Sequence, residues 1–173
     1  SLSPDRCLFE ACIELTARIH ADFRYDPHST DLHTPALTAL EQRCGVCQDF
    51  AHIMLACLRG LGLPARYVSG YLLTQPPPGQ PRLIGADASH AWVSVFLPDA
   101  HGEQALDAGG IQQHGLWCDF DPTNNRFGWG TPGEDYVTVA IGRDFGDVTP
   151  LRGVLHGGGH GHTLDVGVTV EPV

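Results

Sequence analysis

The sequence contains no long apolar run and no run of basic residues, and both absences narrow what the protein can do. No stretch approaches the ~20 consecutive apolar residues of a membrane-spanning helix, so we expect no membrane partner. The 20 acidic residues outnumber the 10 basic ones and give a formal net charge of −10. This charge would repel a phosphate backbone, so we expect no nucleic-acid partner. No signal-peptide pattern opens the chain, which favours a cytoplasmic location.

The cysteine content does not indicate a fold held together by disulfides. The chain has 6 cysteines in 173 residues, and a chain of this length buries about 70% of its unfolded surface without any cross-link. We therefore expect reduced thiols and a single domain over residues 1–173. The first residue is Ser rather than Met, which predicts a piece excised from a longer chain. The oligomeric state stays open.

Helix signals occupy the first part of the chain, and strand signals follow. Ser3-Pro4 and Thr34-Pro35 each pair a capping residue with a proline suited to the first helical turn, and alternating apolar residues dominate later. The predicted helices span residues 4–23, 35–42 and 47–61, and the predicted strands span residues 65–73, 90–97, 116–121, 136–141 and 163–171. This order predicts an α+β fold in which an antiparallel sheet packs on a central, largely apolar helix.

The stretch CGVCQDFAHIMLAC at residues 44–57 is compatible with three different sites. Its Cys-x2-Cys-x4-His-x4-Cys spacing is that of a small zinc-binding interaction domain. If the chain is helical from Cys47, however, His52 and Cys57 point about 140° apart and cannot share one ion. Cys44 and Cys47 could instead form a redox pair, but such pairs follow a strand, and here a helix precedes them.

The third alternative is a nucleophilic cysteine at the start of a helix. The first turn of a helix favours a thiolate, and its free N–H groups can bind a developing oxyanion. A nucleophile of this kind needs a base that is oriented by a third group. His90 begins a predicted strand on the face opposite its aliphatic residues, and Asp119 and Asp121 share that facing on the next strand. The alternation alone does not decide between the two aspartates.

Three ordered segments carry a resemblance to a known family: GVCQDFAH at residues 45–52, SHAWV at residues 89–93 and FDPTN at residues 120–124. They resemble the nucleophile, His and Asp motifs of the transglutaminase-like superfamily, in its bacterial branch of cysteine proteases. By this resemblance Cys47 is the nucleophile and His90 is the general base and acid. The Asp-Pro-Thr match makes Asp121, rather than Asp119, the residue that orients His90.

The resemblance implies a papain-like fold and a thiol-dependent acyl-transfer enzyme. The expected substrate is a peptide, a protein or a glutamine-type amide, attacked through a thioester intermediate. Hydrolysis is the expected outcome, and transfer to an amine is the alternative. A non-catalytic peptide-binding module on the same fold is also open. The family branch often carries an additional N-terminal β-rich domain, and we expect no metal and no other cofactor.

Several polar residues outside the three catalytic positions have simpler structural explanations. We expect Asp49 to cap its helix, His52 to make a structural hydrogen bond, and Cys57 to be a small core residue. Cys44 is expected to be a bystander, with a regulatory disulfide to Cys47 as the alternative. For Trp92, lining of an acyl groove and simple packing are both open. Solvated turns are expected for two further groups of residues: Asp144 and Asp147, and His156, His160 and His162.

Overall fold

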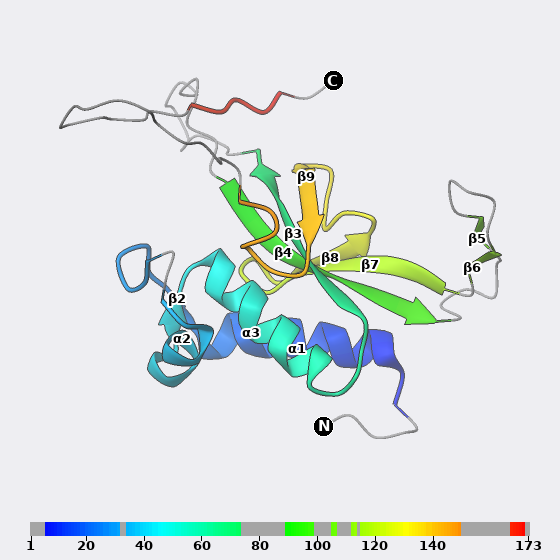
Figure 1. Ribbon diagram of the computed structural model, residues 1–173, viewed down its shortest axis with the longest axis horizontal. Coiled ribbons are helices and arrows are strands. Elements are labelled where there is room, and N and C mark those ends of the chain that lie inside the picture. Colours follow the sequence, from blue (N-terminus) through cyan, green and yellow to red (C-terminus); the bar gives the residue numbers. More distant parts are fainter. Residues whose placement is uncertain are drawn as a thin grey trace.

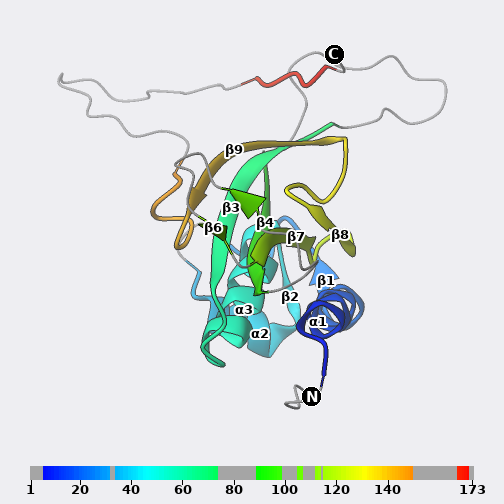
Figure 2. The same ribbon diagram turned by 90° about the vertical axis from the view of Figure 1, so that its right-hand side faces the viewer.

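The computed structural model describes residues 6–31, 34–73, 89–98, 105–106, 112–113, 115–149 and 167–171. The predicted glycine-rich turn with His156, His160 and His162 lies outside these residues, as do residues 163–166 of the predicted last strand. Within the described part, three helices gather on one face of a five-stranded antiparallel sheet (Figure 1), and the turned view shows the same two layers (Figure 2). This is the predicted α+β arrangement.

The helices follow the predicted order, but the first begins later than predicted and the third, predicted over residues 47–61, ends at Arg59. Helix α1 spans Leu8–Asp22, four residues later than the predicted start at residue 4, because Arg6 and Cys7 are not helical. Helix α2 (Ala36–Gln42) begins directly after Pro35, as predicted. Helix α3 spans Cys47–Arg59. None of the helices in the described ranges is long and apolar enough to cross a membrane.

Helix α3 is the centre of the core. Its buried side chains include Phe50, Met54 and Leu58, which pack against the sheet face turned toward the helices. The expectation that Cys57 is a core residue is wrong, because its side chain is exposed. A helix that packs on a sheet buries only the stripe facing the sheet and its neighbours, and Cys57 lies outside that stripe.

The main sheet has the strand order β8-β7-β4-β3-β9. Its strands are β3 (Ala65–Leu72), β4 (Ser89–Pro98), β7 (Gly115–Asp121), β8 (Arg126–Trp129) and β9 (Tyr136–Gly142). The sequence did not predict β8, nor the two-residue strands β1 (Arg24–Tyr25), β2 (Cys44–Gly45), β5 (Ala105–Leu106) and β6 (Gln112–Gln113). In residues 167–171 of the predicted last strand, the structure has only an isolated bridge at Val168.

The alternation in β4 separates two environments. Ala91, Val93 and Val95 belong to the core under α3, whereas Trp92 packs on the opposite face with Val68. His90 shares the facing of Trp92, because side chains two residues apart point to the same side of a strand. The predicted division of this strand is therefore confirmed.

Replacing Gly70 by Ala should destabilise the protein. Gly70 lies directly opposite His90 in the β3–β4 ladder, and the pairing of β3 with β9 has a bulge at this point. A Cβ here would meet the backbone carbonyl of Val137 and would lie 2.6 Å from the Trp92 ring. We expect a loss of about 1–3 kcal/mol in the free energy of unfolding, measured by urea denaturation. The matched control is Gly146→Ala in an exposed turn, which should change much less; equal losses in both variants would contradict the steric explanation.

Candidate active site

Cys47 occupies the first position of α3. The preceding strand β2 pairs in parallel with β1, and the backbone N–H of Asp26 donates to the Gly45 carbonyl at 3.0 Å. The Cys47 thiol is free and partly exposed. A reachable sulfur at the positive end of a helix dipole has the surroundings that a thiolate nucleophile requires.

Asp49 fixes the chain just before the nucleophile. Its carboxylate Oδ2 accepts a hydrogen bond from the backbone N–H of Val46 at 2.9 Å and another from the Thr30 hydroxyl at 2.6 Å. Gly45 is required beside it, because a Cβ at that residue would lie 2.6 Å from the same oxygen. The predicted capping role of Asp49 is confirmed, and the contact with Thr30 adds a long-range tie that the sequence pattern did not indicate.

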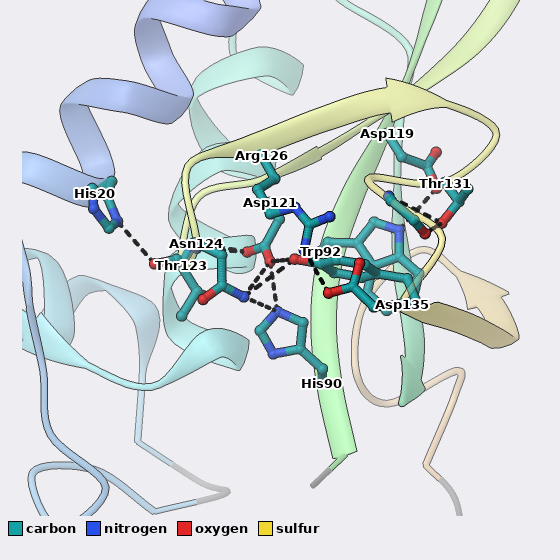
Figure 3. A network of polar contacts seen from close by, with 12 residues as sticks. His20, His90, Trp92, Asp119, Asp121, Thr123, Asn124, Arg126, Thr131 and Asp135 are labelled. Atoms are coloured by element: carbon teal, nitrogen blue, oxygen red, sulfur yellow. Dashed lines mark hydrogen bonds and ion pairs between the residues drawn. The ribbon is translucent and has the colours of Figure 1, made fainter. Parts of the chain in front are cut away.

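His90 lies near the start of β4 with only 9% of its surface exposed. Its Nε2 and the carboxylate Oδ2 of Asp121 are 2.7 Å apart (Figure 3). The side chain of Cys47 lies near enough to the imidazole to raise the pKa of His90. Because Asp121 holds Nε2, Nδ1 is the nitrogen left to exchange a proton with a sulfur.

The structure distinguishes the two aspartates that the alternation left open. Asp121 is fully buried and holds His90, whereas Oδ2 of Asp119 accepts a hydrogen bond from the Trp92 indole N–H at 2.8 Å. The two residues therefore share a strand face but contact different groups. Asp121, at the end of β7, is the one within reach of the imidazole.

Asp121 accepts hydrogen bonds from several directions besides His90. The Tyr136 hydroxyl donates to its Oδ2 at 2.7 Å, and the Asn124 side-chain amide donates to the same oxygen at 2.8 Å. The backbone N–H groups of Thr123 and Asn124 donate to its Oδ1. Sequence reasoning missed both side-chain donors, although Asn124 stands inside the FDPTN motif.

The electrostatics favour a positively charged imidazole. Burial by itself would lower the pKa of His90, but the hydrogen bonds and negative charges of Asp121 and Cys47 outweigh it and raise the pKa to about 10. Burial would raise the pKa of Asp121, yet hydrogen bonding and the charge of His90, with further hydrogen bonds from Tyr136 and Asn124, hold it below its ordinary value. The two shifts support the same charge state, an imidazolium beside a carboxylate.

The other members of the stretch at residues 44–57 do not converge on a common point. His52 accepts a hydrogen bond from the backbone N–H of Phe145, as a structural histidine should, and Cys57 is exposed on the far part of the helix. Cys44 is buried beside the Arg24 guanidinium. Among the described residues no group of three or more His, Cys, Asp or Glu side chains could hold a metal ion. The helical geometry therefore argues against a zinc knuckle here.

The structure also decides between packing and groove lining for Trp92, and it shows whether Asp144 and Asp147 are turn residues. Trp92 has no exposed surface, so it packs in the interior rather than lining an open groove. Asp147 accepts hydrogen bonds from the backbone N–H and the guanidinium of Arg143, and Asp144 accepts one from the Gly146 N–H. Both aspartates are turn residues, as predicted.

Comparison with known proteins yields one family match. A family model described as the transglutaminase-like superfamily matches residues 3–122. An uncharacterized protein of Mycobacterium tuberculosis is 43% identical over 172 residues, which cover 99% of this chain and 50% of the relative. A protein-glutamine gamma-glutamyltransferase of Pseudomonas aeruginosa is 32% identical over 93 residues, 49% of this chain and 14% of that protein. The chain spans about half the length of the curated mycobacterial relative.

A solved structure shares the fold. A crystal structure from Cytophaga hutchinsonii, described as a "Putative Cysteine Protease", superposes with a TM-score of 0.58 and 29% sequence identity. The match covers 82% of this chain and 38% of that one. The similarity extends over most of the chain, so the predicted papain-like arrangement of helices and antiparallel sheet is confirmed.

Stability should fall as the pH rises from about 6.5 to about 10. The imidazole has an ordinary pKa of about 6.5 in the unfolded chain, and the folded environment raises the pKa of His90 to about 10. The stabilisation is therefore complete below pH about 6.5 and is lost as the pH passes through the folded value. We expect the free energy of unfolding from urea denaturation to decrease over this interval. His90→Gln should largely remove the slope, and an equal slope in that variant would contradict the assignment.

Replacing Asp49 by Ala should lower the free energy of unfolding by about 2 kcal/mol, because the Val46 N–H and the Thr30 hydroxyl lose their acceptor. Asp49→Asn keeps an acceptor oxygen and should lose less. Thermal and urea denaturation of both variants measure the difference. Equal losses would show that the negative charge, and not the hydrogen bonds, stabilises this helix start.

Proposed function

The chain belongs to the transglutaminase-like superfamily, and we propose that it is a thiol-dependent acyl-transfer enzyme with a Cys47-His90-Asp121 triad. The family and the cysteine-protease neighbour support a thiol enzyme in general. One arrangement carries the specific proposal: Asp121 holds Nε2 of His90, and the side chain of Cys47, at a helix start, lies near enough to raise the pKa of that imidazole. Each of the three groups has the partner that its role requires.

The acylation half of the reaction starts from an ion pair. His90 holds the proton that Cys47 has given up, and Asp121 stabilises this imidazolium. The thiolate attacks the carbonyl carbon of an amide, and the first N–H groups of α3 stabilise the oxyanion. When the intermediate collapses, the carbon–nitrogen bond breaks and His90 gives its proton to the leaving amine. A thioester between Cys47 and the acyl group remains.

The deacylation half needs a second nucleophile. His90 removes a proton from water, and the resulting attack on the thioester releases a carboxylic acid and restores the thiol. An amine in place of water would give a new amide. We propose hydrolysis of a peptide or a related amide as the main activity, with amine transfer as the alternative that the Pseudomonas relative's name suggests.

Two further functions are alternatives to catalysis. A peptide-binding module on the same fold would keep the architecture without needing an activated sulfur. A zinc-binding interaction domain is disfavoured by the direction of His52 and Cys57 along α3. Both alternatives predict a Cys47 thiol that reacts no faster than the other accessible thiols.

Thiol alkylation at graded pH tests the proposal directly. We expect iodoacetamide to modify Cys47 selectively near neutral pH, because an adjacent imidazolium stabilises the thiolate. His90→Ala should raise the pH at which Cys47 reacts. The modified residue is identified by mass spectrometry of peptides.

Cys57 provides the internal control, because it is exposed on the same helix but lies near the opposite end from Cys47. Its alkylation should be indifferent to His90→Ala. Uniform reactivity of several cysteines, unchanged in that variant, would refute an activated nucleophile and favour the binding module.

The choice between water and amine is decided by products. We expect the protein, incubated with peptides that contain glutamine, to release acid or ammonia that Cys47→Ser does not release. Adding a primary amine should leave hydrolysis dominant. Quantitative incorporation of the amine, seen by mass spectrometry, would instead establish transfer as the main reaction.

A further inference from the structure

The imidazole of His90 is bounded by aromatic rings as well as by polar partners. The Trp92 ring lies nearly parallel to it, with centroids 6.2 Å apart and an interplanar angle of 30°, and the Tyr136 ring centroid is 5.9 Å away. Trp92 follows His90 by two residues on the same face of β4, so its ring flanks the imidazole along the strand. These rings restrict the rotations that would carry the imidazole away from Asp121.

The Trp92 ring is itself fixed from three sides. Tyr136 packs edge-on against it, with centroids 5.4 Å apart and an interplanar angle of 86°. Gly70 leaves the space that the ring occupies, since a Cβ there would lie 2.6 Å from it. Asp119 accepts the indole N–H at 2.8 Å (Figure 3). Of these constraints, only the hydrogen bond sets the rotation of the indole in its own plane.

Asp119 has no other side-chain hydrogen bond in the described part of the chain. It is 97% buried, and its second oxygen, Oδ1, has no hydrogen-bond partner. A buried polar atom without a partner costs stability, so packing alone does not explain a carboxylate at this position. Arg66, which faces Asp119 from β3, stacks its guanidinium on the Trp117 ring. The negative charge of Asp119 raises the pKa of Arg66 against the effect of burial, and the bond to the indole is the one side-chain hydrogen bond of Asp119 in the described chain.

We propose that Asp119 is a positioning residue, which holds the Trp92 indole in the orientation that keeps His90 between Asp121 and Cys47. Asp119 acts through Trp92, since its hydrogen bond goes to the indole. The groups that face His90 are Asp121 from β7, Cys47 from α3, Tyr136 from β9, Trp92 from β4 and the side-chain amide of Asn124, which lies 3.3 Å from Nε2. The inference rests on the proposed role of His90 as the base.

The test compares Asp119→Leu with Asp119→Asn. Leu removes the acceptor and frees the indole, whereas Asn keeps an oxygen that can accept the N–H. We expect Asp119→Leu to slow alkylation of Cys47 at neutral pH by about tenfold, as small errors in placing a catalytic group do. Asp119→Asn should recover most of the rate. The titration midpoint of His90, followed by NMR, should move down in the Leu variant and return toward the native value in the Asn variant.

Ser94→Ala is the matched control. Ser94 is fully buried directly opposite Asp119 in the β4–β7 ladder, and its hydroxyl likewise has no hydrogen-bond partner in the described chain. It should leave the rate and the His90 titration unchanged. A loss equal to that of Asp119→Leu would show a general disturbance of this face and would overturn the proposal.

Two other results would also overturn the proposal: a native His90 titration in Asp119→Leu, or a loss in Asp119→Asn as large as in Asp119→Leu. If Asp119→Leu does not fold, Trp92→Phe serves instead, because it keeps a ring and removes the donated N–H; a native titration there refutes the proposal. The NMR titration needs no turnover. If no amide is cleaved and the His90 midpoint still responds to Asp119, the proposed function fails and the positioning role stands.

Discussion

A carboxylate with no access to water must find its hydrogen-bond donors within the protein, and Asp121 meets this demand with the groups that form the candidate site. His90, Tyr136 and Asn124 all donate to one of its oxygens, and two backbone N–H groups donate to the other. Removal of the charge would leave these donors facing one another without an acceptor. The orientation of the imidazole depends on this carboxylate.

The architecture brings these groups together from separate parts of the chain. The antiparallel pairing of β4 with β7 carries His90 and Asp121 to the same end of the sheet. Helix α3 packs on the face of that sheet opposite to the one that carries Trp92 and His90. The parallel pairing of β1 with β2 holds the loop from which the helix begins. The site thus lies where the first turn of a buried helix meets the ends of central strands, on rigid elements that can keep reacting groups in place.

Two carboxylates besides Asp121 stabilise the surroundings of the candidate site. Asp49 accepts hydrogen bonds from the loop before Cys47 and from Thr30, and Asp119 accepts one from Trp92. Each fixes an element that contacts a proposed catalytic group, the first the start of α3 and the second the ring beside His90. Together with Asp121 they place three buried acidic residues near one site. Buried carboxylates are costly, and such groups gather where a protein uses their hydrogen bonds.

The sequence by itself determined the class of fold, the central helix and the spacing of the three motifs, because apolar periodicity and helix-start signals are local properties of the chain. Alternation placed His90, Asp119 and Asp121 on the right face, but period two cannot say which of two like residues reaches a partner. That choice depends on strand register and on the end of β7, which only the tertiary structure decides. Tyr136 escaped prediction for the same reason, since a contact between residues on separate strands leaves no local pattern, whereas Asn124 lies within the motif that contains Asp121 and was overlooked there. Cys57 was wrongly predicted to be a core residue, because the sequence of a helix shows which residues share a side but not which side its neighbours will cover.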